Sequence, residues 1–219
     1  MFQAQVFTLY PEVFPGPLSK GLYGKALSNK LWNLNVINIR DVATDKHKTV
    51  DDTPYGGGTG MLLKADVLAN ALDQNNKKGQ RVFYLSPKGK KFDQKLALDL
   101  SKEKSISLIC GHFEGVDERV LTTRNIEEIS VGDYILSGGE TAALVVLDSI
   151  LRLLPGVLGN DKSSHDETFE NGLLEYPQYT KPQIWEEKPV PDVLLSGDHS
   201  KIKDWRLSQS EAITRVRRP

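Results

Sequence analysis

The sequence predicts an α/β protein built on a mostly parallel sheet with flanking helices. Strand-like segments alternate along the chain with segments of helical periodicity, which is the pattern of consecutive β-α-β units. Some strand-like segments end at glycines beside charged residues, as strands do at the ligand-binding edge of a parallel sheet. The chain has 219 residues, 39% of them hydrophobic, which is enough for one domain or one domain with a small appendage.

The first half of the chain supplies most of the alternation. The periodicity predicts strands over 3–9, 34–39, 81–85 and 106–110, and helices over 18–30, 65–75 and 93–102, with a turn at 86–89. Residues 40–61 are too polar and glycine-rich to pack as a regular element, and a loop of this length is typically functional. Its glycines fit neither a P-loop nor GxGxxG, so a phosphate-binding role is disfavoured. A lid or close-approach surface and a plain loop both stay open.

The second half ends in a different kind of sequence. We expect a short helix over 117–123, a strand around Ile129 and a helix over 140–154 that is apolar almost all round. Such a helix must be buried against the sheet or against another subunit, so a dimer is plausible. Residues 159–182 are polar, and 197–219 resume a helical pattern. We therefore predict a ligand-binding α/β domain at 1–158, a mobile linker at 159–182 and a small helical C-terminal segment at 183–219.

Two glycine turns make the strongest candidate for a ligand site. In the first, VGDYILSGGETAAL, a β-like Tyr134–Leu136 runs into Ser137-Gly138-Gly139 before a helix opens at Glu140. Glycines let backbone approach a ligand, and the first N–H groups of a helix lack intrahelical partners. The second turn, CGHFEGVDER, follows the strand that ends at Cys110. Together with the turn after Leu85 they predict a crevice for an organic ligand, although each could also be an ordinary strand-to-helix corner.

Composition narrows the class of protein. The net charge is −1, but residues 1–100 carry 14 basic and 9 acidic side chains while residues 101–219 carry 14 and 20, so contact with a polyanion must be local. The single cysteine, Cys110, cannot form an internal disulfide, and its apolar neighbours predict a buried structural thiol. No apolar stretch approaches the length of a membrane span and no signal-peptide pattern opens the chain. We expect a cytoplasmic protein with no membrane partner.

Seven ordered motifs resemble one family. The chain carries, in order, TVDDxPYGGGxGM, YLSPxG, CGxxEGxDER, GDYxLSGGE, PGVLG, GLLExPxYTxP and LLSGxHxxIxxWR. These resemble the motifs of the bacterial tRNA (guanine-N1)-methyltransferases of the SPOUT class, and the resemblance runs from about Phe7 to Pro219. The resemblance implies S-adenosylmethionine as the methyl donor and the tRNA guanosine immediately 3′ of the anticodon, position 37, as the acceptor. It also implies a homodimer with the active site at the subunit interface and a trefoil knot in the cofactor region. Only the resemblance supports the knot, because knotted chains are rare.

The resemblance also assigns residues. Those that match the family's cofactor-binding motifs are Tyr84, Leu85, Ser86, Pro87, Gly111, Val131, Gly132, Asp133, Tyr134, Ile135, Leu136, Gly138 and Gly139. It assigns no metal-binding residues, but it allows Mg²⁺ near Glu114, which matches an acid close to the guanine. A cap for the helix that follows Asp117 is the other explanation for Glu114.

Methylation of guanine N1 requires a base for its proton and a cation for the charge that moves to O6. The family's proposed base is an aspartate before a Ser-Phe pair, and the matching position here is Glu167, followed by Thr168-Phe169. Glutamate is a departure from the family, so the adjacent Asp166 stays open as the base. Arg152 matches the family's catalytic arginine, with an interface ion pair as its alternative. The runner-up reaction is 2′-O-methylation of ribose. Members of the family continue beyond Arg-Arg-Pro, so we expect part of the tRNA-binding tail to be missing.

Overall fold

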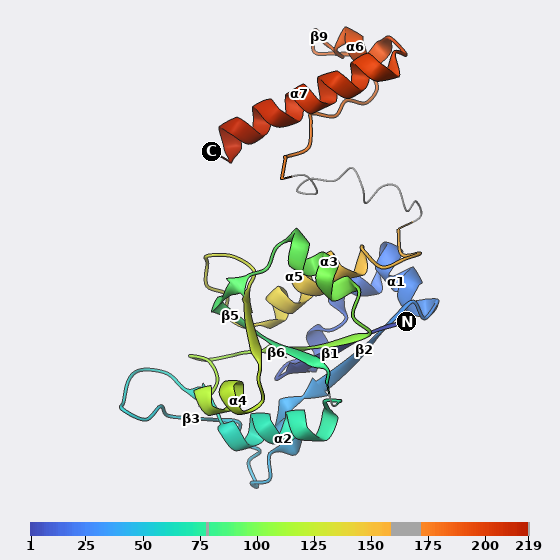
Figure 1. Cartoon of the computed structure of the whole chain (residues 1–219). Helices are drawn as coiled ribbons and strands as arrows, with labels where there is room; N and C mark the ends of the chain where they lie inside the picture. The colour runs from blue at the N-terminus through green and yellow to red at the C-terminus, as the bar shows by residue number, and fades with distance from the viewer. Residues whose placement is uncertain (78, 159–171, 219) are drawn as a thin grey trace. The chain divides into compact units, whose positions relative to one another are not determined.

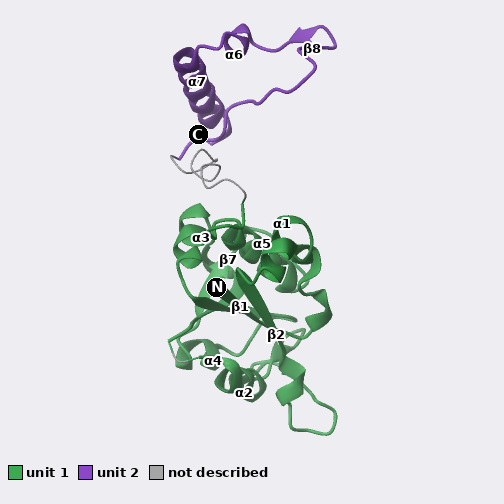
Figure 2. Ribbon diagram, turned by 90° about the vertical axis from the view of Figure 1, so that its right-hand side faces the viewer, with its two compact units in different colours: residues 1–160 green, residues 161–219 purple. Residues whose placement is uncertain are grey.

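The computed structural model describes residues 1–77, 79–158 and 172–218, in two compact units formed by residues 1–160 and 161–219 (Figure 2). The first unit is built on a five-stranded sheet in the order β2-β1-β6-β5-β7, in which every pairing is parallel. Its strands are β1 (Phe2–Thr8), β2 (Trp32–Asn38), β5 (Arg81–Lys91), β6 (Ser105–Cys110) and β7 (Glu127–Ser130). The predicted α/β class with a mostly parallel sheet is confirmed. The knot stays a prediction.

Helices cover both faces of this sheet (Figure 1). On one face lie α1 (Gly21–Ser28), α3 (Gln94–Ser101) and α5 (Glu140–Leu151), and on the other lie α2 (Ala65–Asn75) and α4 (Glu118–Thr123). Successive side chains of β1 point to opposite faces, so Val6 joins the core under α5 while Phe7 joins the core under α2. Burial on both faces explains why the central strands read as nearly continuous apolar runs.

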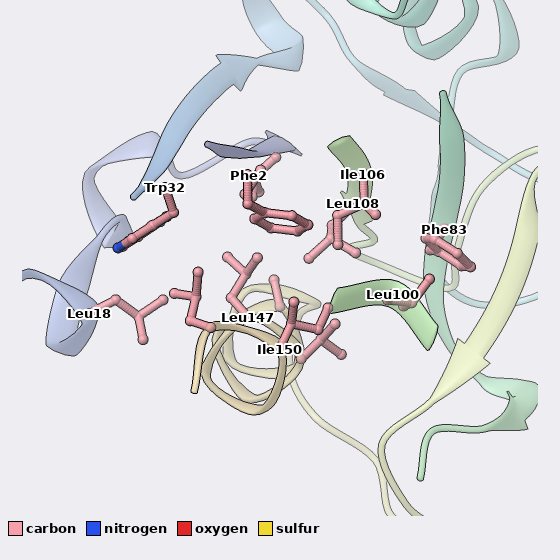
Figure 3. Packing of buried hydrophobic residues seen from close by; sticks show 14 of the residues in the cluster. Phe2, Leu18, Trp32, Phe83, Leu100, Ile106, Leu108, Leu147 and Ile150 are labelled. Carbon is pink, nitrogen blue, oxygen red and sulfur yellow. The ribbon is translucent and has the colours of Figure 1, made fainter. Parts of the chain in front are cut away.

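The core under α5 is the larger of the two apolar clusters. Figure 3 shows Leu147 and Ile150 of α5 facing Phe2 and Leu108 of the sheet, with Trp32 at one side of the cluster. Leu147, Ile150, Leu108 and Trp32 are fully buried. Such side chains each contribute roughly 1.5–3 kcal/mol by leaving water. The prediction that this helix is buried on most of its surface is therefore confirmed for its sheet-facing side, while Val145 stays 43% exposed.

Short elements complete the first unit, and the second unit is built around one helix of 19 residues. In the first unit they are three 3₁₀ turns, η1 (Pro11–Val13), η2 (Gly16–Ser19) and η3 (Ile39–Val42), and an antiparallel pair, β3 (Asp51–Asp52) and β4 (Leu62–Leu63). The second unit contains β8 (Ile184–Trp185), β9 (Lys188–Pro189), α6 (Asp192–Leu195) and α7 (His199–Arg217). Residues 172–182 pack against α7, where Arg206 lies over the ring of Tyr176 and Thr214 accepts from the N–H of Leu174. In the part of the chain that is described, no helix combines the length and apolar character needed to cross a membrane.

Two helices begin where the sequence predicted them, to within one residue. The helix predicted over 65–75 has those bounds as α2, and α3 starts at the residue after Asp93, whose side chain accepts from the N–H of Leu96. The helix predicted over 18–30 is wrong as one element. It is divided into η2 and α1, because Gly21 has φ +56° and breaks the helical path between them.

The turn predicted at 86–89 is wrong as a strand end. β5 continues to Lys91, and both Leu85 and Lys90 pair with Ile129 of β7, so the residues between them form a bulge. At Gly89 a side chain would collide with the backbone of Ile129, so glycine permits the strand to resume. The sequence indicated that β5 leaves regular pairing after Leu85, but it did not indicate that β5 pairs with β7 again at Lys90.

The strand predicted at Tyr134–Leu136 is also wrong. β7 ends at Ser130, where the side-chain oxygen accepts from the N–H of Gly132, and residues 131–139 form an irregular segment. Tyr134 and Ile135 are 54% and 82% exposed. Their consecutive apolar side chains do not reflect sheet pairing, and the segment forms one wall of the cavity described next.

Candidate functional site

A cavity of about 290 Å³ lies beside the bulge of β5 and the carboxyl-terminal ends of β6 and β7. Three segments form it, residues 84–87, 111–115 and 129–139, together with Ala142 of α5. The volume is at the lower limit of the usual range for small-molecule sites, about 300–1,000 Å³. The three glycine-marked turns that the sequence placed in one crevice do meet in space.

The structure brings nearly all predicted cofactor residues together. Every one except Asp133 lines this cavity, which leaves Tyr84, Leu85, Ser86, Pro87, Gly111, Val131, Gly132, Tyr134, Ile135, Leu136, Gly138 and Gly139 in its wall. Their role in binding a cofactor stays a prediction. Sequence reasoning missed other lining residues, of which His112, Ser130 and Ser137 carry polar side chains. His112 and Ser137 lie inside the two motifs, so including whole motifs would have found them, whereas Ser130 lies just before VGDYILSGGETAAL begins.

The glycine turn before α5 packs directly on the end of β6. The N–H of Gly139 donates to the carbonyl of Gly111 over 2.9 Å. A Cβ atom on Gly139 would lie 2.6 Å from Cys110 Cα, and one on Gly138 would lie 2.5 Å from His112 Nε2. Real Cβ atoms do not approach that closely, so backbone excludes a side chain at Gly139, and at Gly138 a side chain would displace His112. The glycines therefore allow two backbone segments to form one continuous wall.

Burial keeps two titratable side chains beneath the cavity, those of Tyr84 and Cys110, in their uncharged forms. Burial raises the pKa of Tyr84 to about 12, with a smaller contribution from the charge of Glu128. The Tyr84 ring also fills the space beside Gly111, where a Cβ would lie 2.8 Å from its hydroxyl. Burial, and then the nearby charge of Glu140, raises the pKa of the Cys110 thiol. Cys110 is fully buried, as the sequence predicted, and it is a packing residue rather than a nucleophile.

Glu114 connects the cavity with the glycine-rich loop. It lines the cavity, and its N–H donates to the carbonyl of Met61 over 2.9 Å. Gly60 packs on its side chain, where a Cβ would lie 2.7 Å from the carboxylate oxygen. The alternative explanation, a cap for the next helix, is wrong because Asp117 is the N-cap of α4. The Arg119 guanidinium holds the pKa of Asp117 below its ordinary value, which agrees with a structural role for this pair.

Arg152 does not line the cavity. It is the C-cap of α5, and Gly139 is the N-cap of the same helix. At 1.5 Å per residue these two residues are roughly 20 Å apart along the helix axis. The two candidate bases, Glu167 and Asp166, lie outside the described residues.

A larger concavity of about 720 Å³ lies elsewhere on the first unit, beside β4, α2 and α4. Its wall includes Arg119 and Asp117, which are paired with each other. Pairing leaves that part of the wall with little charge to offer a ligand, and only the smaller cavity is enclosed by the glycine turns. Among residues 1–77, 79–158 and 172–218, no group of three or more His, Cys, Asp or Glu side chains is arranged to hold a metal ion.

A parallel sheet whose carboxyl-terminal edge carries a glycine-walled cavity defines the first unit as a ligand-binding α/β protein of the kind common among enzymes. Comparison with known proteins gives its family. Residues 2–219 match the family described as tRNA (Guanine-1)-methyltransferase TrmD, and the chain belongs to that family. The resemblance read from the motifs, to tRNA (guanine-N1)-methyltransferases of the SPOUT class, is confirmed.

The similarity to individual relatives covers the whole chain. The chain is 81% identical to a "tRNA (guanine-N(1)-)-methyltransferase" of Pelagibacter ubique over 219 residues, which is 100% of this chain and 96% of the relative. It is 58% identical over 218 residues to a protein of the same name from Bartonella tribocorum, covering 100% and 94%. A third, from Brucella canis, is 56% identical over 218 residues, covering 100% and 89%.

Proposed function

We propose that the protein transfers a methyl group from S-adenosylmethionine to N1 of the guanine at tRNA position 37, in the cytoplasm. The single observation that carries the proposal is the cavity at the edge of the sheet, walled by the same motifs that mark the family. The names of the relatives specify guanine N1, and they do not favour the alternative of 2′-O-methylation.

The cavity suits the adenosyl part of the donor. Gly138 and Gly139 expose backbone to the cavity, and Ile135 and Leu136 supply apolar side chains beside it. An adenine ring needs an apolar slot edged by backbone donors and acceptors, and this combination provides one. When bound, S-adenosylmethionine supplies an electrophilic methyl group on a sulfonium. The chain's task is then to orient the donor and to exclude water from it.

The acceptor guanine needs help from two kinds of side chain. N1 carries a proton in the neutral base, and a carboxylate within hydrogen-bond reach can remove it. We assign that role to Glu167, with Asp166 as its competitor. As the proton leaves, negative charge moves toward O6, where the guanidinium of Arg152 would stabilise it. We also assign contact with the guanine edge to Glu114, a role that its lining of the cavity and its backbone hydrogen bond to the glycine-rich loop support. Mg²⁺ beside Glu114 stays a prediction from the resemblance.

The position of Arg152 supports a homodimer. Ala142 is the last residue of α5 that lines the cavity, and Arg152 lies ten residues beyond it, roughly 15 Å along the helix axis. A second copy can provide the arginine, and Val145 on α5 together with Leu22 on α1 offers exposed apolar surface for the contact. Two inactive variants, Arg152→Ala and the cavity variant Gly139→Ala, should regain activity when mixed. Equal mixing makes half of the dimers mixed, each with one intact site, which gives roughly a quarter of the parental rate. No recovery after demonstrated subunit exchange would refute a shared site.

Methyl transfer to defined transcripts tests the proposed reaction. Labelled S-adenosylmethionine is incubated with tRNA transcripts that carry guanosine or adenosine at position 37, and the modified atom is mapped by mass spectrometry. We expect transfer only to the guanosine transcript, at N1. Modification of a ribose oxygen would favour the rival reaction.

Three single variants test the base. Removing a general base typically costs a factor of about 10²–10⁴ in rate, so Glu167→Ala should lose that much while Asp166→Ala and the matched control Glu170→Ala stay near the parent. Loss in Asp166→Ala alone would transfer the role to Asp166. Parental rates in both would show that neither carboxylate is the base.

A further inference from the structure

A buried carboxylate lies behind the cavity without lining it. Glu140, the first residue of α5, is 7% exposed. Burying an ionised carboxylate is costly unless it is paired and hydrogen-bonded. Glu140 has a partner at each carboxylate oxygen, since Oε1 accepts from the hydroxyl of Thr8 over 2.5 Å and Oε2 lies 2.7 Å from His112 Nε2. The N-terminus of α5 adds a favourable field for the negative charge.

The three residues join three different elements. Thr8 is the last residue of β1, His112 follows the end of β6, and Glu140 opens α5. The Thr8 hydroxyl oxygen also accepts from the N–H of Tyr10, and the Tyr10 ring lies against the His112 ring with centroids 4.8 Å apart. One carboxylate therefore fixes two strand ends and a helix start relative to one another.

This network sits directly against the glycine wall. A Cβ atom on Gly138 would lie 2.7 Å from Glu140 Oε2, and Gly139 is bonded to Gly111 beside His112. His112 lines the cavity, whereas Thr8 and Glu140 do not. Any effect of Thr8 or Glu140 on a ligand must pass through His112 and the two turns.

We propose that Thr8 and Glu140 are positioning residues, which hold the 111–112 and 138–139 turns at the spacing that S-adenosylmethionine binding requires. The inference rests on the proposed function, because it concerns the donor site of that reaction. Charged buried pairs add little stability when compared with apolar replacements, so stability alone is a weak reason for such a network here. Its location against the cavity wall gives it a use.

The test compares two buried hydroxyls. Thr8→Val removes the hydroxyl group that donates a hydrogen bond to Glu140 and keeps the side-chain shape. Ser107→Ala is the matched control, because Ser107 is also fully buried and donates over 2.7 Å to Asn76 Oδ1. Ser107 lies three residues before the end of β6, roughly 10 Å along the strand from Cys110, and outside the cavity wall. Calorimetry gives the Kd for S-adenosylmethionine, and steady-state kinetics give kcat and the two KM values.

A hydrogen bond to a charged group is strong enough that Thr8→Val should raise the Kd for S-adenosylmethionine about tenfold. The KM for the donor should rise in parallel, while kcat at saturating donor and the KM for tRNA stay near parental values. Ser107→Ala should lower the melting temperature and leave the Kd unchanged. Thr8→Ser, which keeps the hydroxyl, should restore parental binding.

Glu140→Gln provides a second, independent variant if Thr8→Val fails to fold. The carboxamide keeps the shape and one acceptor but loses the charge, so we expect a smaller rise in Kd, about threefold. Parental Kd in either folded variant would overturn the inference, as would an equal rise in Ser107→Ala. A parental protein that binds no S-adenosylmethionine would instead refute the proposed function, so the two failures are distinct.

Discussion

Replacing Gly139 by alanine should force the glycine turn away from β6. The added Cβ would lie 2.6 Å from Cys110 Cα and 2.9 Å from the backbone nitrogen of Gly111. Carbon atoms in contact prefer about 3.5–4.0 Å, so the two backbones must separate by about 1 Å. Both neighbours are backbone atoms at a buried strand end, and neither can rotate away. The hydrogen bond from Gly139 to Gly111 would lengthen at the same time.

The cost of this substitution is packing alone. Gly139 has φ −78°, which alanine adopts freely, so no backbone strain contributes. Overpacking of this kind costs about 1–3 kcal/mol, and each kcal/mol lowers the melting temperature of a chain this size by about 2–4 °C. The displaced wall should also weaken binding of S-adenosylmethionine, which isothermal calorimetry measures.

Gly79→Ala is the control that separates stability from binding. Gly79 has φ +81° and nothing within 4 Å of its Cβ position, so alanine there suffers backbone strain of about 1–2 kcal/mol without touching the cavity. Both variants should lose similar stability, and only Gly139→Ala should lose donor binding. A Gly139→Ala protein with parental melting temperature and parental Kd would refute the reasoning.

Three further predictions concern the frame around the site. Trp32→Ala should lower the free energy of unfolding, measured with denaturant, by about 3–5 kcal/mol, because Trp32 is fully buried and its indole donates to the carbonyl of Tyr23. The matched control is Trp185→Ala, at a 60% exposed side chain, which should change that free energy by no more than about 0.5 kcal/mol. Equal losses would contradict the packing in Figure 3. Asp117→Ala should cost about 0.5–2 kcal/mol at pH 7 by removing the cap of α4. Arg119 lowers the folded-state pKa of Asp117 below 3.8, so this stabilisation is present above that pH and disappears as the pH falls through the lowered pKa. The difference in free energy of unfolding between variant and parent should therefore vanish in acid. A difference that is independent of pH would contradict the assignment. Cys110 should react with a thiol reagent only as the protein unfolds, since burial raises its pKa, and rapid labelling of the native protein would show that the end of β6 is open.

Local sequence features predicted the elements whose ends are fixed locally. Asp93 and Asp117 cap their helices with their own side chains, so the sequence alone marks where α3 and α4 begin. The path of the chain after Leu85 depends instead on how β5 pairs with β7, which lies some forty residues further along the chain. No local preference of residues 86–89 could reveal that the strand resumes. The apolar residues 134–136 misled for a related reason, because apolar character reports burial or a ligand wall equally well.

The site follows the same division between local and distant information. Motif resemblance located Gly111, Gly138 and Gly139 in the cavity wall, because a short motif specifies the backbone geometry that places them there. It could not locate the contacts that Thr8 makes, since Thr8 is 132 residues from Glu140 in sequence and belongs to no motif. The sequence showed Glu140 only as the start of a helix, where an acidic residue is common. Only the fold reveals that its side chain points inward and joins β1 to β6. The motifs therefore specify the cavity wall, while Thr8, which lies outside them, acts with Glu140 to determine how far apart its segments are held.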